Sequence, residues 1–200
     1  MDEANSNTMF KGYDENLSDS ENPSADDVRT VQERFTQVLS QRYPFLRLEF
    51  DCGPLDEAIV SMISPDRRPL ILYIHNDRSV ATHIFCERVL CTDKIASCLD
   101  ENFTIWPWDR TSDINYTGLL VMLNKHCGQQ IKDVISSFAT DDYPLLCCLI
   151  WNEGQVKVAD TIQGTTSIDD TLNRLNQVRD SSDSSVISPP PMNGRILRYP

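Results

Sequence analysis

The chain has 200 residues, 40% of them hydrophobic, which is enough for one domain with a substantial core. Its formal net charge of −12 argues against nucleic acid as a main partner, because phosphates repel an acidic surface. No apolar run approaches the roughly 18 residues of a membrane-spanning helix, and no signal peptide is visible, so we expect a soluble protein of the cytoplasm or nucleus.

Residues 1–25 are rich in acidic and small polar side chains. They contain too few apolar side chains to offset the entropy of ordering the chain, so the sequence predicts a disordered acidic tail. From Asp26 to Gln41, apolar residues recur at helical spacing, and Asp26 and Asp27 are placed to cap this helix. We expect its apolar face to pack on the domain that follows.

Two short elements follow the first helix. Leu46, Leu48 and Phe50 alternate with charged residues, which is the period of a half-buried strand. The segment from Leu55 to Ile63 predicts a short helix that stops before Pro65.

The stretch from Pro69 to Thr82, PLILYIHNDRSVAT, combines an apolar run, a polar turn and a helix that begins near Ser79. Chemistry is often placed at such a turn, because the helix start carries unsatisfied donors and positive partial charge. Helical patterns then run from Ser79 to Leu90 and from Asp93 to Leu99, with a break near Cys91.

The segment from Phe103 to Trp106 predicts a strand that ends at Pro107. Trp106 and Trp108 then lie near the strand end. We expect one of them in the core and the other beside a surface groove.

The remaining elements are a helix, a hairpin and a last helix. The segment from Asp113 to Cys127 predicts a helix, and the glycine after it is placed to end it. The buried strand from Leu145 to Trp151 is followed by a turn and a second strand from Gln155 to Ile162, which indicates an antiparallel hairpin. A capped helix is predicted from Ser167 to Val178. Residues 180–200 predict a flexible linker or tail rich in serine and proline.

The seven cysteines are interpreted as small apolar residues. No interval between them is Cys-x-x-Cys, and the three histidines, His75, His83 and His126, are scattered along the chain. A zinc site needs closely spaced cysteine or histidine ligands. We therefore expect no metal ion and no cofactor.

The order strand, helix, strand, helix, hairpin and terminal helix resembles that of a thioredoxin-like fold, with Tyr143-Pro144 at the position of its cis-proline. More specifically, LYIHNDRSVATHIFCERVLC, NFTIWPWD, YPLL and IQGTTSIDDTL resemble the UAS domain of the Fas-associated factor family, over about residues 34–178. The resemblance implies an α/β fold in which helices flank a central mixed β-sheet, with an added N-terminal helix. It places the domain at residues 26–179.

Thioredoxin catalysis needs two thiols, one deprotonated at the helix start and one that resolves the mixed disulfide. When the segment from His75 to His83 is laid on the oxidoreductase loop, Ser79 and Thr82 occupy the two cysteine positions. A serine hydroxyl is too weakly acidic to replace a thiolate there. Redox activity is therefore the disfavoured interpretation. We interpret Ser79 as a helix cap and Thr82 as a residue that packs or hydrogen-bonds in the first turn.

Four further residues near this turn, His75, Asp77, His83 and Asp109, loosely resemble an acid–base set. No nucleophile or metal completes the set, so we expect that the protein is not an enzyme.

The resemblance implies a non-catalytic interaction module of an adaptor in ubiquitin-dependent protein degradation. In relatives, a UBX domain recruits the valosin-containing AAA ATPase, and other segments bind ubiquitin. Residues 1–27 do not fit a ubiquitin-associated helix bundle, and the residues after Asp180 do not fit a UBX domain. We therefore expect these contacts to depend on segments outside this chain.

A second function implied by the resemblance is sensing of long-chain unsaturated fatty acids, with self-association on lipid binding. It would need an apolar groove for the acyl chain and a cation for the carboxylate. The alternative interpretation is solvated surface arginines and core tryptophans. The candidate lipid-binding residues are Arg67, Arg68, Arg78, Arg88, Trp106 and Trp108.

Overall fold

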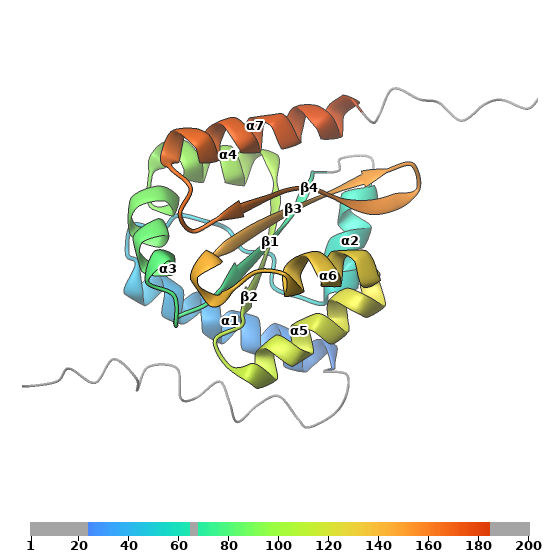
Figure 1. Ribbon diagram of the computed structural model, residues 1–200, viewed down its shortest axis with the longest axis horizontal. Helices are drawn as coiled ribbons and strands as arrows, with labels where there is room; N and C mark the ends of the chain where they lie inside the picture. The colour runs from blue at the N-terminus through green and yellow to red at the C-terminus, as the bar shows by residue number, and fades with distance from the viewer. Residues whose placement is uncertain (1–23, 65–67, 185–200) are drawn as a thin grey trace, which may run out of the picture.

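The computed structural model of this chain describes residues 24–64 and 68–184. Most of the predicted acidic tail, most of the predicted linker and Arg67 lie outside these residues. Within them, four strands form one sheet in the order β2-β1-β3-β4 (Figure 1). The strands are β1 (Leu70–His75), β2 (Thr104–Asp109), β3 (Leu145–Asn152) and β4 (Gln155–Gln163).

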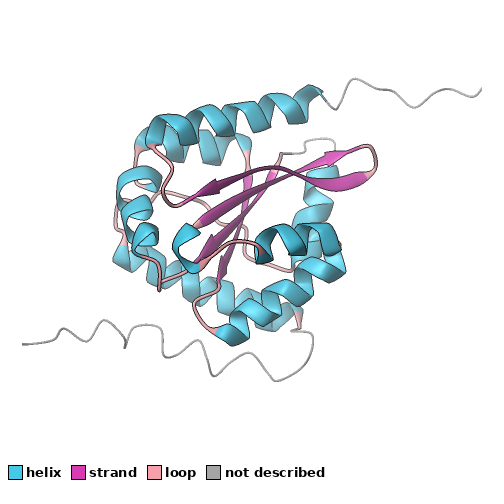
Figure 2. Cartoon of the chain, in the orientation of Figure 1, coloured by secondary structure: helices cyan, strands magenta, loops and turns pink. Residues whose placement is uncertain are grey.

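The pairing of the strands identifies the fold. β1 is parallel to β2, with Leu70 opposite Thr104, whereas β3 is antiparallel to both β1 and β4. A tight turn joins β3 to β4, and its residues Glu153 and Gly154 have φ angles of 53° and 78°, as a two-residue hairpin turn requires. Helices lie on both sides of the sheet (Figure 2). This arrangement is the predicted thioredoxin-like fold.

The helices have the following bounds: α1 (Ala25–Arg42), α2 (Leu55–Ile63), α3 (Val80–Phe85), α4 (Asp93–Asn102), α5 (Asp113–His126), α6 (Gln129–Ser136) and α7 (Ile168–Ser184). A π-helical turn, η1 (Cys86–Leu90), continues α3, and a 3-10 turn, η2 (Thr140–Asp142), precedes β3. α1 is the added N-terminal helix. α6 and η2 were not predicted. Ile131 and Ile135 of α6 do recur at helical spacing and are buried, whereas η2 has only three residues and carries no periodic pattern.

The helix ends follow local side-chain chemistry. α1 begins one residue earlier than predicted, at a capping box in which Ser24 and Asp27 bond each other's backbone N–H. Ser167 caps α7 as predicted, since its Oγ accepts from Asp170 N at 3.2 Å. α7 continues to Ser184, six residues beyond the predicted helix end at Val178.

The segment from Leu46 to Phe50 is not a strand, contrary to the prediction. Its side chains do alternate between exposed and half-buried. Its backbone forms no strand ladder: Glu49 N donates to the Asp100 carboxylate at 3.2 Å, and Asp51 N just after it donates to Ile105 O at 2.8 Å. The alternation therefore indicated which side chains are half-buried and not which backbone groups are paired.

β2 does not end at Pro107 but continues to Asp109. A proline is tolerated because β2 is an edge strand, and the Pro107 carbonyl accepts from Gln32 Nε2 at 2.9 Å. Trp106 and Trp108 are both fully buried, with their rings stacked at 5.4 Å. The prediction that one of them faces a groove is wrong, because residues two apart on a strand point to the same face.

Gly164, just after β4, lies against Tyr143 and Pro144 in the loop before β3. A Cβ at this position would lie 2.5 Å from Tyr143 O and 2.6 Å from Pro144 Cδ, so the backbone would have to move. We expect Gly164→Ala to lower the free energy of unfolding by about 1–3 kcal/mol in urea titrations. Gly53→Ala is the control, because the atoms nearest to its new Cβ belong to the flexible side-chain ends of Arg29 and Glu57, at 3.4 Å and 3.6 Å. Equal stability of the two variants would contradict the predicted clash.

Candidate functional site

The turn after β1 holds Ser79 and Thr82, the two residues predicted at the cysteine positions of an oxidoreductase. Ser79 is the N-cap residue of α3 and is 1% exposed, but its hydroxyl does not cap the helix. The hydroxyl instead donates to Tyr143 O at 2.9 Å. Tyr143 and Pro144 are joined by a cis peptide bond, as predicted. The predicted capping role of Ser79 is therefore wrong, and its side chain ties α3 to the loop before β3.

Thr82 lies one helical turn further along α3. Its side chain is fully buried, and its Oγ1 has no hydrogen-bond partner among the described residues. It packs in the first turn, in agreement with the first of the two roles proposed for it. Because Ser79 and Thr82 are both closed to solvent, neither hydroxyl can meet a substrate without local opening of the helix.

The thiols offer no replacement for the missing cysteine pair. All seven cysteines are free. Cys86, the nearest to the turn in sequence, is fully buried with its Sγ 3.2 Å from the Tyr73 hydroxyl. Burial raises the pKa of the other six thiols, to about 12 in Cys127, and this disfavours a reactive thiolate. These thiols are Cys52, Cys91, Cys98, Cys127, Cys147 and Cys148.

Asp77 is the centre of a polar cluster beneath the turn. Its carboxylate forms an ion pair with Arg42 at the end of α1. The Nε2 atoms of His75 and His83 lie 3.8 Å and 3.5 Å from the same oxygen, Oδ1. Although burial opposes the charge, the positive groups of His75 and Arg42 lower the pKa of Asp77. The carboxylate is therefore held ionised by groups from two separate elements, α1 and β1.

His75 is fully buried at the end of β1. Its Nδ1 lies 2.9 Å from the Tyr73 hydroxyl. Burial disfavours a charged imidazole, but the neighbouring Asp77 carboxylate outweighs it, and the pKa of His75 is raised to about 9. For the half-exposed His83, whose Nδ1 lies 2.8 Å from the Tyr43 hydroxyl, burial lowers the pKa. The two histidines therefore differ in charge at neutral pH.

The structure brings the predicted acid–base set together, with two of its members, His75 and Asp109, inside the protein. Asp109 is 1% exposed, its carboxylate accepts from Thr111 N at 2.9 Å, and burial raises its pKa. Thr111 Oγ1 in turn accepts from Asp77 N at 2.8 Å. Since His75 and Asp109 are closed to solvent, the arrangement joins α1, β1, α3 and β2 and presents no substrate site. Sequence reasoning missed that Arg42 pairs with Asp77 and that the Tyr143 carbonyl accepts from Ser79. These partners lie 35 and 64 residues apart in the chain.

The structure does not gather the three candidate lipid-binding arginines that it describes. Arg68 precedes β1, and its Nη1 donates to Asp100 O at 2.7 Å. Arg78 follows β1, about 20 Å of strand away, where it faces Asp113 at 3.5 Å. Arg88 is exposed on η1. With Trp106 and Trp108 in the core, no described apolar groove links these cations.

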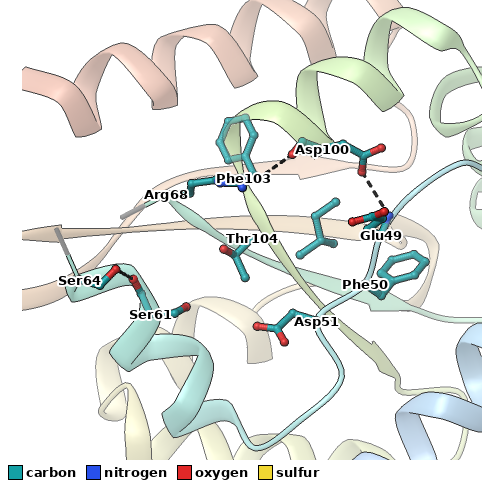
Figure 3. A pocket seen from close by; sticks show the side chains of 10 residues that line it. Glu49, Phe50, Asp51, Ser61, Ser64, Arg68, Asp100, Phe103 and Thr104 are labelled. Carbon is teal, nitrogen blue, oxygen red and sulfur yellow. Dashed lines mark hydrogen bonds between the residues drawn. The ribbon is translucent and has the colours of Figure 1, made fainter. Parts of the chain in front are cut away.

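A groove of about 400 Å³ lies at the start of β1, at the opposite end of this strand from the turn (Figure 3). We call it the acidic groove, because it is lined by the carboxylates of Glu49, Asp51 and Asp100. Phe50 and Phe103 form part of its apolar wall, and Arg68 lies at its edge. The sequence did not indicate this groove, since its residues come from α2, α4, β2 and two loops.

Two other kinds of site are not found. The described residues contain no group of three or more histidine, cysteine, aspartate or glutamate side chains that could hold a metal ion. None of the described helices is long and apolar enough to cross a membrane.

Comparison with known proteins gives matches to one family. A family model described as Fas-associated factor 1 matches residues 35–177. FAS-associated factor 1 of Mus musculus is 36% identical over 145 residues, which cover 71% of this chain and 22% of the mouse protein. UBX domain-containing protein 3 of Caenorhabditis elegans is 30% identical over 115 residues, which cover 56% of this chain and 19% of the worm protein. The chain spans about a fifth of the length of these relatives.

Among solved structures, a thioredoxin from Thermus thermophilus matches with a TM-score of 0.46 and 17% sequence identity. The match covers 66% of this chain and 86% of the thioredoxin.

The charge of His75 predicts a pH dependence of stability. Its pKa is about 9 in the folded protein and about 6.5 in an unfolded chain, so folding favours the protonated form. This contribution is complete below about pH 6.5 and is lost as the pH rises through 9. We expect the wild type to lose on the order of 1–3 kcal/mol relative to His75→Gln between these pH values, measured by urea unfolding. A profile for His75→Gln that runs parallel to that of the wild type would contradict the assignment.

Proposed function

Because this chain belongs to the Fas-associated factor 1 family, we propose that its thioredoxin-like domain is a non-catalytic protein-interaction module. The observation that carries the proposal is the hydrogen bond from Ser79 Oγ to Tyr143 O. An oxidoreductase needs a solvent-accessible thiolate at this helix start. Here a buried hydroxyl occupies the position and serves as a tether.

The surface around the turn supports an interaction role. Val80 and Ile84 lie one helical turn apart on α3 and are 72% and 47% exposed. Ile114, at the start of α5, is 45% exposed, and its neighbour Asp113 is the residue that Arg78 faces. Apolar side chains that remain exposed beside a rigid turn suit contact with another protein.

We further propose that the module works within an adaptor of ubiquitin-dependent protein degradation. This proposal rests on the family and on relatives such as UBX domain-containing protein 3, which are about five times as long as the matched segment. In this interpretation, recruitment of the valosin-containing ATPase and binding of ubiquitin depend on parts of the relatives that the match does not cover. The domain described here would position those parts or hold a further partner.

The geometry does not favour fatty-acid sensing at the residues suggested by the sequence. Trp106 and Trp108 are fully buried, and their indole N–H groups donate to the Gly53 and Asn115 carbonyls at 2.8 Å and 3.0 Å. Arg68 lies beside carboxylates that would repel a fatty-acid head group. We therefore do not assign a lipid site.

The first experiment tests the absence of redox catalysis. In an insulin-reduction assay with dithiothreitol, we expect the full chain to turn over no faster than the blank, because it has no accessible thiol pair. A thioredoxin serves as the positive control. Turnover above the blank that disappears in Cys86→Ser would contradict the non-catalytic assignment.

The second experiment tests how the module relates to the ATPase. We expect a pull-down with the full 200-residue chain to retain no valosin-containing ATPase above the level of an unrelated bait. A longer relative with a UBX domain is the positive control. Robust retention by this chain would mean that it contains a docking segment of its own.

A further inference from the structure

The acidic groove carries negative charge that the described residues do not neutralise. Glu49, Asp51 and Asp100 line it, and none of these carboxylates forms an ion pair with a described cation. The one arginine at the groove, Arg68, donates through Nη1 to the backbone carbonyl of Asp100. Among the described residues, carboxylates therefore exceed cations by two charges at this position.

Two helix ends add to the negative electrostatic potential of the groove, independently of the carboxylates. α2 ends beside Ser61 and Ser64, and α4 ends beside Asp100 and Phe103, so both C-termini meet at the groove (Figure 3). The C-terminus of a helix carries negative partial charge and favours a cation. Neither helix has a basic residue in its last turn. The groove therefore favours a cationic group that the described residues do not supply.

The walls suit a long cationic side chain. Phe50 and Phe103 border the groove, and the Phe50 ring lies 5.9 Å from that of Tyr73, which fixes its position. An arginine can lay its aliphatic stem and guanidinium plane against aromatic rings and direct its N–H groups to carboxylates. A small inorganic cation would leave the aromatic wall unused.

The chain itself contains a segment of complementary charge. Residues 185–200, SVISPPPMNGRILRYP, include Arg195 and Arg198 and no acidic residue, although the whole chain has a net charge of −12. Apolar residues, Ile196, Leu197 and Tyr199, accompany the two arginines. This combination of cationic and apolar groups matches the composition of the groove.

The groove lies within reach of this segment. α7 packs along α4 (Figure 1). Arg179 on α7 is close enough to Cys98 on α4 for its positive charge to lower the pKa of this thiol, against the rise that burial causes. The last turns of α7 therefore run beside the half of α4 that leads to the groove. The 11 residues from Ser184 to Arg195 can span about 36 Å, against a length of about 15 Å for α4.

We propose that the acidic groove is a docking site for an arginine-containing segment, and that its occupant is the segment from Gly194 to Tyr199 of the same chain. Arg195 or Arg198 places its guanidinium among the three carboxylates, and the adjacent apolar side chains cover Phe50 and Phe103. The contact is electrostatic and solvent-exposed, so it is weak and reversible. A separate protein with a similar basic segment would compete for the same groove.

The test uses ¹⁵N NMR on the full 200-residue chain at low salt. We expect Arg195→Glu with Arg198→Glu to shift the amide signals of Glu49 to Asp51 and of Asp100 to Ile105. The exchange rate of the Glu49 amide, which donates to Asp100, should rise about twofold to fivefold, the range expected for an exposed ion pair. Wild type in about 0.5 M salt should show the same shifts, because the Debye length falls to about 4 Å.

Lys157→Glu, on the β3-β4 hairpin, is the matched charge-reversal control and should leave the groove amides unchanged. In a chain with Asp51→Asn and Asp100→Asn, the two arginine substitutions should have no further effect on those amides. The proposal is overturned if the arginine substitutions leave the groove amides of the wild type unchanged, or if their effect persists without the two carboxylates. It is also overturned if an added arginine-containing peptide shifts the groove amides while the arginine substitutions do not, because the occupant would then be a separate partner.

Discussion

The burial of β1 is the constraint on which the rest of the structure depends. All six residues from Leu70 to His75 are fully buried, because β2 and β3 pair with its two edges and helices lie on both sides of the sheet. The strand ends in polar groups that cannot reach bulk water. They are tolerated because neighbouring elements supply their partners, above all the ion pair of Arg42 with Asp77 and the bond from Ser79 to Tyr143 O. The turn is thereby held rigid from several sides.

This rigidity explains how a redox architecture can serve a different purpose. A thioredoxin-like fold positions two thiols at the start of a helix beside a cis-proline. In this chain the cis-proline, Pro144, is present. Ser79, which we predict at the first thiol position, directs its hydroxyl inwards, and Thr82, which we predict at the second, is buried. The Ser79 hydroxyl connects α3 to the loop before β3. What remains at the surface is a fixed shape with exposed apolar side chains, Val80 and Ile84, which suits binding.

The two ends of β1 differ in how their charge is balanced. Beyond His75, the Asp77 carboxylate is surrounded by an arginine and two imidazoles, so its charge is met within the domain. Before Leu70, the acidic groove has three carboxylates and two helix C-termini with Arg68 as the one described cation. A balanced cluster stabilises the fold, whereas an unbalanced one attracts a group from elsewhere. The domain thus has a rigid apolar surface at one end and an electrostatic surface at the other.

The sequence by itself determined the elements whose signals are local: α2, β1, the β3-β4 hairpin, the cap at Ser167 and the absence of a Cys-x-x-Cys pair. It also indicated the fold class and the position of Pro144. Only the tertiary structure decided that residues 46–50 pair with no strand, that both tryptophans are buried and that the Ser79 hydroxyl reaches Tyr143 O. The same holds for the acidic groove. For Glu49, Trp106 and Ser79 the partner lies more than 50 residues away, and local periodicity reports which side of an element is buried but not which distant group meets it.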